Sequence, residues 1–519
     1  MKKWIGIYSI LFAIAAYITY QLDQASAETY YSLQLSGGGI YSILLIGIAT
    51  FIFIALLIKS AVILHKRIPL AQASIFEGKR ILVVWAIIFL GWLPCLIAFL
   101  PGMGMDVDTT VILRNGIIAW RQHPVIYCFI VQVLAIVGQL LGDINYGILL
   151  YSLLQMILLS GTCTYAVWWL YKRKCPDALL ILLIVYFVSS FVIADYSITM
   201  LKDTMFSATL LFWSFLVYDI IDTDGAILGS FSYRCFYLFI ALSCIVLRNN
   251  GIYVCIVVGL CLYTIVGKWR KKLLILTVIA ALLGSAPNAC LKIITGRKPL
   301  FQEAVAIPLQ QIARVAAVDG KITEKQRLFL EKLFPVESMK EKYDPRRADN
   351  VKWDGGFQRE WLDDNRGEFI KIWAGMLKSN LPIYIDAYIN QTYGLWTVHP
   401  RIAPADIYYT IESEDIHGLH VLPPDWENGL QTLYQQNAKF LDTGICIWIV
   451  LLLGIIIRIN KGNRYALVIL PVVIVWLTLM VSVPAMNFRY VFWYPLALPV
   501  ILLMAICPLR KLDTGERVS

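Results

Sequence analysis

The chain has 519 residues, of which 59% are hydrophobic and 15% charged, a balance that excludes a soluble globular protein. Its formal net charge is +10, but residues 291–440 carry 19 basic against 20 acidic side chains, which leaves 26 against 15 in the rest. The basic excess lies between apolar stretches, where the positive-inside rule places it, so we infer no nucleic-acid partner. Eleven cysteines are spread singly and none lies in 291–440, so neither a disulfide framework nor a zinc site is expected there.

The N-terminal 80 residues hold two apolar windows, 4–20 and 40–59. Lys2 and Lys3 before the first window and Ala25-Ser26-Ala27 after it resemble a cleavable signal, but the second window favours a retained signal anchor. We expect two transmembrane helices and a cytoplasmic loop in residues 1–80, and whether residues 1–27 are cleaved stays open. Further windows of suitable length to cross a bilayer lie at 81–100, 123–142, 146–170, 178–194, 204–221, 235–247, 251–267, 272–290, 442–459, 465–483 and 490–507.

Counting basic residues between the windows gives the topology. If every window crossed, Lys172-Arg173-Lys174 would lie outside the membrane, against the positive-inside rule. If 123–142 instead lies along the interface or re-enters, all later basic clusters fall on the cytoplasmic side. The sequence therefore predicts an all-α polytopic protein of the bacterial plasma membrane, with about twelve transmembrane helices and both termini in the cytoplasm.

Segment 291–440 is too long for a connecting loop, so we expect it to form a mainly helical extracytoplasmic domain between the ninth and tenth crossings. We expect one helix near 303–318, interrupted by Pro308, and another that begins after Thr323 as N-cap. The remaining parts are a membrane core at 81–290 with an acidic outer loop at 101–145, and three C-terminal transmembrane helices with a cytoplasmic tail at 441–519.

The polar stretch after window 81–100 holds the candidate reaction centre. Asp106 and Asp108 are one residue apart, so on an extended segment their side chains share a face. One is suited to act as a general base on a hydroxyl while the other orients it or binds a metal. A solvated turn with an N-capping aspartate is the alternative. His123, before Pro124, is either an ordinary helix start or a neutral imidazole that contacts a phosphate or hydroxyl.

Short charged clusters at other outer ends of the windows are candidates for binding a lipid phosphate, because Arg offers a bidentate fork and Lys a point charge. Membrane-edge anchoring is the alternative for Lys202 and Arg248. Arg489 stands where positive-inside bias would not put it, which favours a phosphate role. The candidate substrate-binding residues are Lys202, Asp203, Arg248, Asn249, Arg489 and Tyr490.

Within segment 291–440, four side chains bring a carboxylate, two amides and a guanidinium onto about three helical turns. Such groups suit the hydroxyls of a sugar, and an amphipathic helix with a solvated face is the alternative. These residues are Glu303, Gln310, Gln311 and Arg314.

The chain resembles the GT-C superfamily of membrane glycosyltransferases, and more closely an uncharacterised bacterial family within or near it. Short motifs in order along residues 81–507 carry the resemblance: Asp106-Val107-Asp108-Thr109, His123-Pro124, Leu201-Lys202-Asp203, Arg248-Asn249-Asn250-Gly251, Ile307 to Arg314 and Phe488-Arg489-Tyr490. No Trp-Trp-Asp motif is found, which sets the chain apart from oligosaccharyltransferases.

The resemblance implies a GT-C-like fold and transfer of a sugar from a polyprenyl-phosphate donor to an extracytoplasmic acceptor of the cell envelope. Membrane lipids are the other expected partners. Metal dependence is open: Asp106 and Asp108 permit a divalent ion such as Mg²⁺ or Mn²⁺, but a monophosphate donor bound by several cations does not need one. A transporter or flippase of an envelope lipid is one alternative, although no internal repeat of the kind such proteins show is evident. A glycan polymerase or ligase using pyrophosphate-linked donors is another.

Overall fold

The computed structural model describes residues 2–24, 37–71, 76, 78, 80–102, 107–398, 402–404 and 416–512. Within these ranges the fold is all-α, apart from isolated bridges and one antiparallel pair of strands, β1 (Ile402–Pro404) and β2 (Lys439–Leu441). Nine helices of this described part are long and apolar enough to cross a membrane. A tenth span results if α7 (Asp177–Ser189) and α8 (Phe191–Ile198), bent by 57°, are taken together. The fold thus agrees with the expected polytopic membrane protein.

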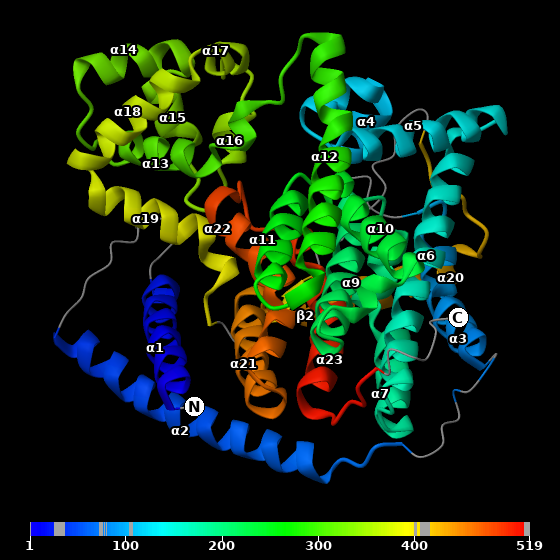
Figure 1. Cartoon of the computed structure of the whole chain (residues 1–519). Helices are drawn as coiled ribbons and strands as arrows, with labels where there is room; N and C mark the ends of the chain where they lie inside the picture. Colours follow the sequence, from blue (N-terminus) through cyan, green and yellow to red (C-terminus); the bar gives the residue numbers. More distant parts are fainter. Residues whose placement is uncertain are drawn as a thin grey trace.

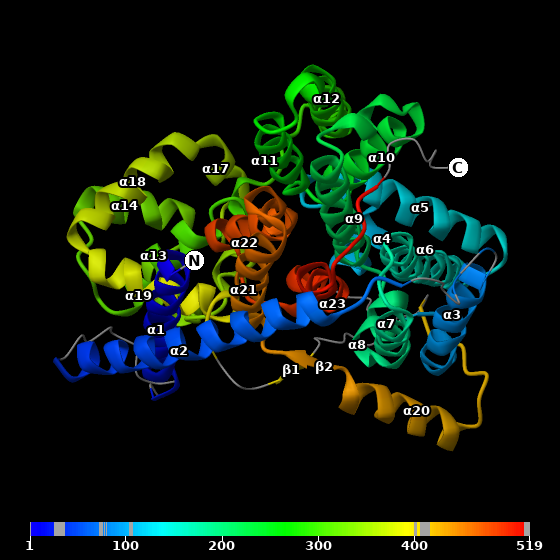
Figure 2. The ribbon, with the colours of Figure 1, turned by 60° about the horizontal axis from the view of Figure 1, so that its bottom comes forward.

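The apolar helices pack into one bundle, called here the apolar bundle (Figure 1). Its central helix is α9 (Lys202–Asp222), in which nearly every residue after Lys202 is buried. Because α9 is surrounded, the charged pair at its start, Lys202 and Asp203, lies at the centre of one end of the bundle. Helix α2 (Gly37–Arg67) runs slantwise along the end of the bundle opposite the cap-side elements, past α21 and α23, and is mostly exposed (Figures 1 and 2). The other bundle helices are α1 (Lys2–Gln24), α3 (Arg80–Ala98), α6 (Ile144–Lys172), α7, α8, α10 (Phe231–Leu247), α11 (Gly251–Tyr263), α12 (Arg270–Thr295), α21 (Thr443–Lys461), α22 (Leu470–Ser482) and α23 (Trp493–Ile506).

A second hydrophobic core lies in residues 301–392, called here the cap domain. Leu309, Leu330, Phe369 and Met376 are completely buried in it. Figure 1 shows the cap domain at one end of the apolar bundle, beside α11 and α22. Its elements are η4 (Phe301–Glu303), α13 (Ala306–Ala317), α14 (Glu324–Leu333), α15 (Val336–Lys342), α16 (Asp349–Lys352), α17 (Arg359–Asp364), α18 (Arg366–Ser379) and α19 (Leu381–Thr392).

The local predictions for the cap domain hold in part. Thr323 caps α14 in a capping box with Gln326, as its sequence position indicates. Pro308 does not interrupt a longer helix but stands in the first turn of α13, where proline is tolerated. The cap domain comprises fewer residues than the expected domain at 291–440. The later part of that segment does not belong to it, because α20 (Pro424–Asn437) returns to pack on α3 and α8 (Figure 2).

Three elements cover the end of the apolar bundle that the cap domain faces. They are α4 (Val107–Asn115), η1 (Gly116–Arg121) and α5 (Val125–Leu140). Helix α5 is apolar and 16 residues long, and it packs against η1 and the first turns of α6. Its length is similar to that of α10 and α11, so the expectation that window 123–142 lies along the interface or re-enters stays a prediction.

The opposite end of the bundle gathers basic segments from distant parts of the chain. Nδ1 of His65 lies 3.1 Å from the carbonyl oxygen of Ile506. The carbonyl oxygen of Arg173 accepts a hydrogen bond from the backbone N–H of Arg510 at 2.9 Å. Nζ of Lys461 donates to the carbonyl oxygen of Cys507 at 2.8 Å. The basic clusters that the topology argument used therefore do share one end, opposite the cap domain.

Candidate functional site

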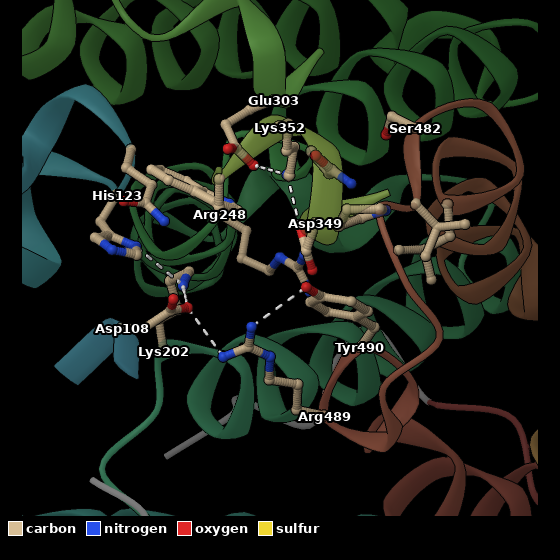
Figure 3. Close-up of a pocket in the computed structure, with 16 residues that line it drawn as sticks. Asp108, His123, Lys202, Arg248, Glu303, Asp349, Lys352, Ser482, Arg489 and Tyr490 are labelled. Carbon is tan, nitrogen blue, oxygen red and sulfur yellow. Dashed lines mark hydrogen bonds and ion pairs between the residues drawn. The ribbon is translucent and has the colours of Figure 1, made fainter. Parts of the chain in front are cut away.

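A cavity of about 200 Å³, called here the inner cavity, lies between the cap domain and the end of the apolar bundle (Figure 3). In the close-up, the cap residues Glu303 and Lys352 face the bundle residues Lys202 and Arg489 across it. Its lining residues are Asp108, Gln122, His123, Lys202, Arg248, Asn250, Glu303, Asp349, Lys352, Trp353, Leu479, Ser482, Val483, Pro484, Arg489 and Tyr490.

The carboxylate of Asp108 is held between two cations. Its Oδ2 lies 2.9 Å from Nη1 of Arg489 and 3.4 Å from Nζ of Lys202. Asp108 stands in the first turn of α4, and the next residue fixes its position, because Oγ1 of Thr109 donates to the carbonyl oxygen of Met200 at 2.6 Å. This bond ties the start of α4 to the segment just before α9, and so brings Asp108 to Lys202.

These charges set the protonation of Asp108 and His123. Burial acts to raise the pKa of Asp108, but the positive charges of Lys202 and Arg489 outweigh it and hold the pKa well below its usual range. Burial, and then the charge of Lys202, lower the pKa of His123 to about 3. At neutral pH the site therefore holds an ionised carboxylate and a neutral imidazole.

The contact with Lys202 determines which ring nitrogen of the neutral His123 imidazole carries the proton. Nδ1 of His123 lies 3.4 Å from Nζ of Lys202, and because an ammonium only donates, Nδ1 is the acceptor and Nε2 carries the proton. Nε2 is buried and has no hydrogen-bond partner among the described residues. The site thus holds a buried N–H donor that no described protein group satisfies.

Two guanidinium groups flank the ring of Tyr490. The guanidinium carbon of Arg248 lies 5.0 Å from the ring centre, and that of Arg489 lies 5.1 Å from it. Nη1 of Arg248 is also 2.6 Å from Oδ1 of Asp203, which is 1% exposed. Asp203 therefore holds Arg248 from behind without lining the inner cavity. The result is a pair of fixed forks of the kind that binds phosphate.

The cap domain contributes a second charged group. Nζ of Lys352 lies 2.8 Å from Oε2 of Glu303 and 3.1 Å from Oδ1 of Asp349. Burial acts to lower the pKa of Lys352, but these two carboxylates raise it overall, so the ammonium stays charged. The other oxygen of Glu303, Oε1, is buried and lacks a hydrogen-bond partner within the described part of the chain. An acceptor thus faces the inner cavity from the cap side.

A larger cavity of about 610 Å³, called here the outer cavity, adjoins the inner one. Both are lined by Asp108, Gln122, Asp349, Trp353, Arg489 and Tyr490, which form a shared wall. Residues that line the outer cavity alone are Val111, Asp344, Arg346, Arg347, Asn350, Ala485, Met486 and Asn487. Asp108 is therefore accessible from two adjoining spaces.

The donor set at Asp108 does not favour a divalent cation. One carboxylate faced by two cations is a poor ligand set for Mg²⁺ or Mn²⁺, which prefer several oxygen ligands. Among the residues that the structure describes, no group of three or more His, Cys, Asp or Glu side chains has the arrangement of a metal site. Asp106 lies outside the described residues, so the expected Asp106 and Asp108 pair is not seen as a pair.

A family model described as a family of unknown function, DUF6020, matches residues 119–518. The chain belongs to the DUF6020 family. The match includes His123, Lys202, Arg248, Arg489 and the cap domain, and it begins after Asp108. No curated protein and no solved structure matches the chain.

The structure brings together seven of the thirteen residues that the sequence singled out. Asp108, His123, Lys202, Arg248, Glu303, Arg489 and Tyr490 all line the inner cavity. Asn249 does not, because its Oδ1 accepts from Nδ2 of Asn288 on the exposed side of α10 and α12. The neighbouring Asn250 lines the cavity in its place.

Three candidates for contacting sugar hydroxyls lie instead inside the cap domain of this DUF6020 chain. Nε2 of Gln310 donates to the carbonyl oxygen of Asp344, and Nε2 of Gln311 donates to that of Tyr384 at 3.2 Å. Arg314 is 2% exposed and lies 3.5 Å from Asp386. These side chains hold α13 to its neighbours, so the placement does not support the expected contact with a substrate.

Sequence reasoning did not find Asp349, Lys352 and Trp353. They lie in and just after α16, a four-residue helix within a polar stretch that has no apolar periodicity. Two backbone contacts bring α16 to the cavity: the N–H of Ala348 donates to the carbonyl oxygen of Pro484 at 2.9 Å, and Arg347 forms a β-bridge with Ala485. No local sequence signal predicts a contact between segments so far apart.

Proposed function

We propose that this protein is a membrane glycosyltransferase that moves a sugar from a polyprenyl-phosphate donor to a hydroxyl group on the extracytoplasmic side. The observation that carries the proposal is the position of Asp108: an ionised carboxylate stands between Lys202 and Arg489 at the end of an apolar bundle, with the forks of Arg248 and Arg489 beside it. A lipid-linked phosphate needs an apolar medium for its chain and cations for its headgroup, and this place offers both.

The charges around the inner cavity suit a singly charged phosphodiester. Its lining has four cations, Lys202, Arg248, Lys352 and Arg489, against the three carboxylates Asp108, Glu303 and Asp349, and His123 is neutral. Asp203, which pairs with Arg248 behind the lining, is a fourth carboxylate, so the group as a whole is neutral. A monophosphate-linked sugar adds one negative charge to this neutral group and a pyrophosphate adds two, so the monophosphate costs less to bind. The donor that we infer is therefore a lipid monophosphate sugar rather than the pyrophosphate-linked glycan of a polymerase or ligase.

The proposed reaction is a single displacement. The acceptor oxygen forms a bond to the anomeric carbon, the bond from that carbon to the phosphate oxygen breaks, and its electron pair leaves on the lipid phosphate. The acceptor proton goes to Asp108. A phosphate that binds Lys202 and Arg489 offsets the charges that hold the pKa of Asp108 down, so donor binding makes this carboxylate a stronger base. The same cations stabilise the negative charge of the departing phosphate.

The unsatisfied groups of the inner cavity suit the transferred sugar. Nε2 of His123 is a buried donor, and Oε1 of Glu303 is a buried acceptor. Ring hydroxyls both donate and accept, so one sugar ring placed between the bundle and the cap domain satisfies both. In this arrangement His123 binds substrate, and Asp108 alone removes the proton.

The proposal also fixes a sidedness. We infer twelve crossings, with the nine long helices joined by the bent pair of α7 and α8 and by the shorter α10 and α11, while α5 stays at the interface. Both termini then lie in the cytoplasm, and the cap domain lies outside the bacterial plasma membrane. The basic clusters at the end opposite the cap support this orientation through the positive-inside rule.

The decisive experiment incubates the purified protein in detergent with a panel of polyprenyl-phosphate sugars and hydroxyl-bearing acceptors from the cell envelope, and measures the lipid phosphate released. We expect at least one donor to release lipid phosphate, and no release from any donor would refute the proposal. Movement of labelled headgroup across liposomes without bond cleavage would identify a transporter or flippase instead.

Two conservative variants separate the roles of the forks. Arg248→Lys and Arg489→Lys keep the charge but lose the bidentate geometry, so we expect single-turnover transfer to slow by about tenfold or more, with a smaller loss of donor affinity. Equal losses of rate and affinity would show that these residues only bind the headgroup. Arg327→Ala, an exposed change on α14, is the control and should alter neither quantity.

A further inference from the structure

The outer cavity has a wall in common with the inner cavity but a different chemistry. Where the inner cavity presents buried cations, the outer one adds the exposed polar side chains Arg346, Arg347 and Asn350, together with Asp344 and Asn487. Asp108 lies on the wall that both share. A base in this place can take a proton from a group in the outer cavity while the donor fills the inner one.

Trp353 is the aromatic residue of the shared wall that is most open to solvent. It is 38% exposed, although it lines both cavities. The guanidinium of Arg359 lies 5.2 Å from its ring centre, which holds the indole in place. An indole that is fixed yet exposed, with carboxylate and amide groups around it, is the arrangement that holds the apolar face of a sugar ring and bonds its hydroxyls.

The outer cavity is also built on fixed backbone. Oδ1 of Asp344 accepts from the N–H of Arg346 at 2.8 Å, and the ring of Tyr393 lies 4.4 Å from the guanidinium of Arg346. The bridge between Arg347 and Ala485 joins the two walls. The polar groups therefore hold defined positions, as recognition of a ring with several hydroxyls needs.

We propose that the outer cavity is the acceptor subsite and that the acceptor is a sugar, so that the protein extends or decorates a glycan. This inference rests on the proposed function. The acceptor ring stacks on Trp353 and directs one hydroxyl to Asp108, while Asn350 and Asp344 bond its other hydroxyls. The oxygen of that hydroxyl forms the new glycosidic bond, its proton goes to Asp108, and the lipid phosphate leaves with the electron pair of the broken bond.

The test measures how much of the donor sugar is transferred to a carbohydrate acceptor and how much is transferred to water and released as free sugar. The full-length protein is given a donor from which it releases lipid phosphate, together with a panel of methyl glycosides as acceptors. We expect glycoside products in the wild type. Trp353→Ala and Asn350→Ala should each shift the ratio of glycoside product to free sugar toward free sugar, by between about threefold and tenfold, the loss that one contact of ordinary strength produces.

Two further variants keep the inference falsifiable. Trp353→Phe retains an aromatic face and should stay nearer the wild-type ratio than Trp353→Ala. Trp426→Ala removes an indole that is 73% exposed on α20, away from both cavities, and should leave the ratio unchanged.

The possible failures are distinguishable. If no donor releases lipid phosphate, the proposed function fails and this inference with it. If the donor is consumed but no methyl glycoside is ever modified, or if Trp353→Ala and Asn350→Ala keep the wild-type ratio, the acceptor subsite is wrong and the donor site stands.

Discussion

Asp108 owes its properties to residues far from it in the chain. Lys202 is 94 positions away and Arg489 is 381 positions away, yet both contact one carboxylate oxygen. A carboxylate paired with two cations stays ionised in a largely buried site, whereas burial raises the pKa of a carboxylate that has no such partners. The same partners are the groups that a phosphate would bind. In the proposed reaction, binding of the donor phosphate would therefore make Asp108 a stronger base.

We expect Asp108→Asn to lower turnover by about 100-fold or more, the usual cost of removing a general base. Donor binding should persist, because Lys202 and Arg489 remain and lose a competing anion. Release of lipid phosphate from the donor panel gives the rate, and equilibrium binding of the same donor gives the affinity. Asp364→Asn, an exposed change in the cap domain, is the matched control. Wild-type turnover of Asp108→Asn would exclude it as the base.

The lowered pKa of His123 predicts how the free energy of unfolding of the protein depends on pH. Its pKa is about 3 in the folded protein against an ordinary value of 6.5, so the unfolded chain binds more protons between these values. Stability is then lost as the pH falls through this window, by about 1.4 kcal/mol per pH unit. The pKa of Asp108 is also lowered, but its ordinary value is 3.8, so its contribution is lost only below that pH.

The measurement compares thermal unfolding midpoints in detergent at pH 7.5 and pH 4.5. We expect His123→Gln, which cannot titrate, to show a smaller drop between the two than the wild type. An equal drop in both proteins would mean that His123 is already protonated at pH 4.5, and the imidazole would then be charged under mildly acidic conditions.

At the scale of elements, at least three links among the described residues hold the cap domain over the inner cavity. One is the backbone contact between α16 and residues 484–485, and a second is the hydrogen bond that Nε2 of Gln391 donates to the carbonyl oxygen of Val483 at 2.7 Å. A third centres on Arg121, at the end of η1, which contacts Glu360 at 2.7 Å and Asp363 at 3.2 Å in α17 and donates to the carbonyl oxygen of Lys298 at 3.0 Å. Because Arg121 is two residues from His123, this link fixes both the cap and one wall of the cavity.

Arg121→Ala should loosen the cap domain without unfolding it. Glu360 is 74% exposed, so its ion pair adds little stability, and Asp363 keeps Arg366 at 2.8 Å. We expect faster amide hydrogen exchange in residues 116–123 and 297–303, with transfer slowed several-fold. The exposed Arg327→Ala is again the control. Unchanged exchange and activity would show that the other links hold the cap domain in place without Arg121.

The elements also show where a local pattern misleads. Lys172-Arg173-Lys174 has the composition of a solvated basic anchor, but Arg173 is 2% exposed. It pairs with Asp219 of α9, and its guanidinium lies 3.8 Å from the ring of Trp169. The cluster keeps its sidedness, since Lys172 is exposed. One of its three charges nevertheless belongs to the interior, where it joins α6 to the central helix.

At the scale of the whole molecule, charge is sorted to two ends of the apolar bundle. The basic clusters gather at one end, and the paired charges of the inner cavity gather at the other beneath the cap domain. Charges at the basic end interact with water and lipid headgroups, as membrane anchors do. Those at the cavity end interact mainly with one another, which is typical of a binding site.

The proposed orientation predicts which end reacts in intact cells. A cysteine at Asn350 should react with a membrane-impermeant thiol reagent, and one at Lys172 should not. Both positions are exposed, so burial does not explain a difference. The native Cys235 and Cys290 are exposed as well and must first be replaced. Labelling at 172 but not at 350 would reverse the orientation and place the cavity in the cytoplasm.

The sequence by itself determined the class of the protein and much of its local structure. A long apolar window, a Thr323 cap or a basic cluster depends on neighbours a few residues away, and these neighbours are visible in the chain. The cations Lys202, Arg248 and Arg489 could be singled out for the same reason, because each interrupts an apolar pattern, with membrane-edge anchoring as the alternative for Lys202 and Arg248. Seven of the residues chosen from the sequence line the inner cavity, and the roles proposed for them are still predictions.

Only the tertiary structure decided which of these groups meet. Gln310 and Arg314 lie on a helix whose polar face looks solvated in sequence, and the packing of the cap domain buries that face. Asp349, Lys352 and Trp353 reach the cavity because a backbone contact joins α16 to a segment more than a hundred residues later. Periodicity reports which face of a segment is apolar. It does not report which distant segment covers the other face, because that depends on the shape and charge of both partners.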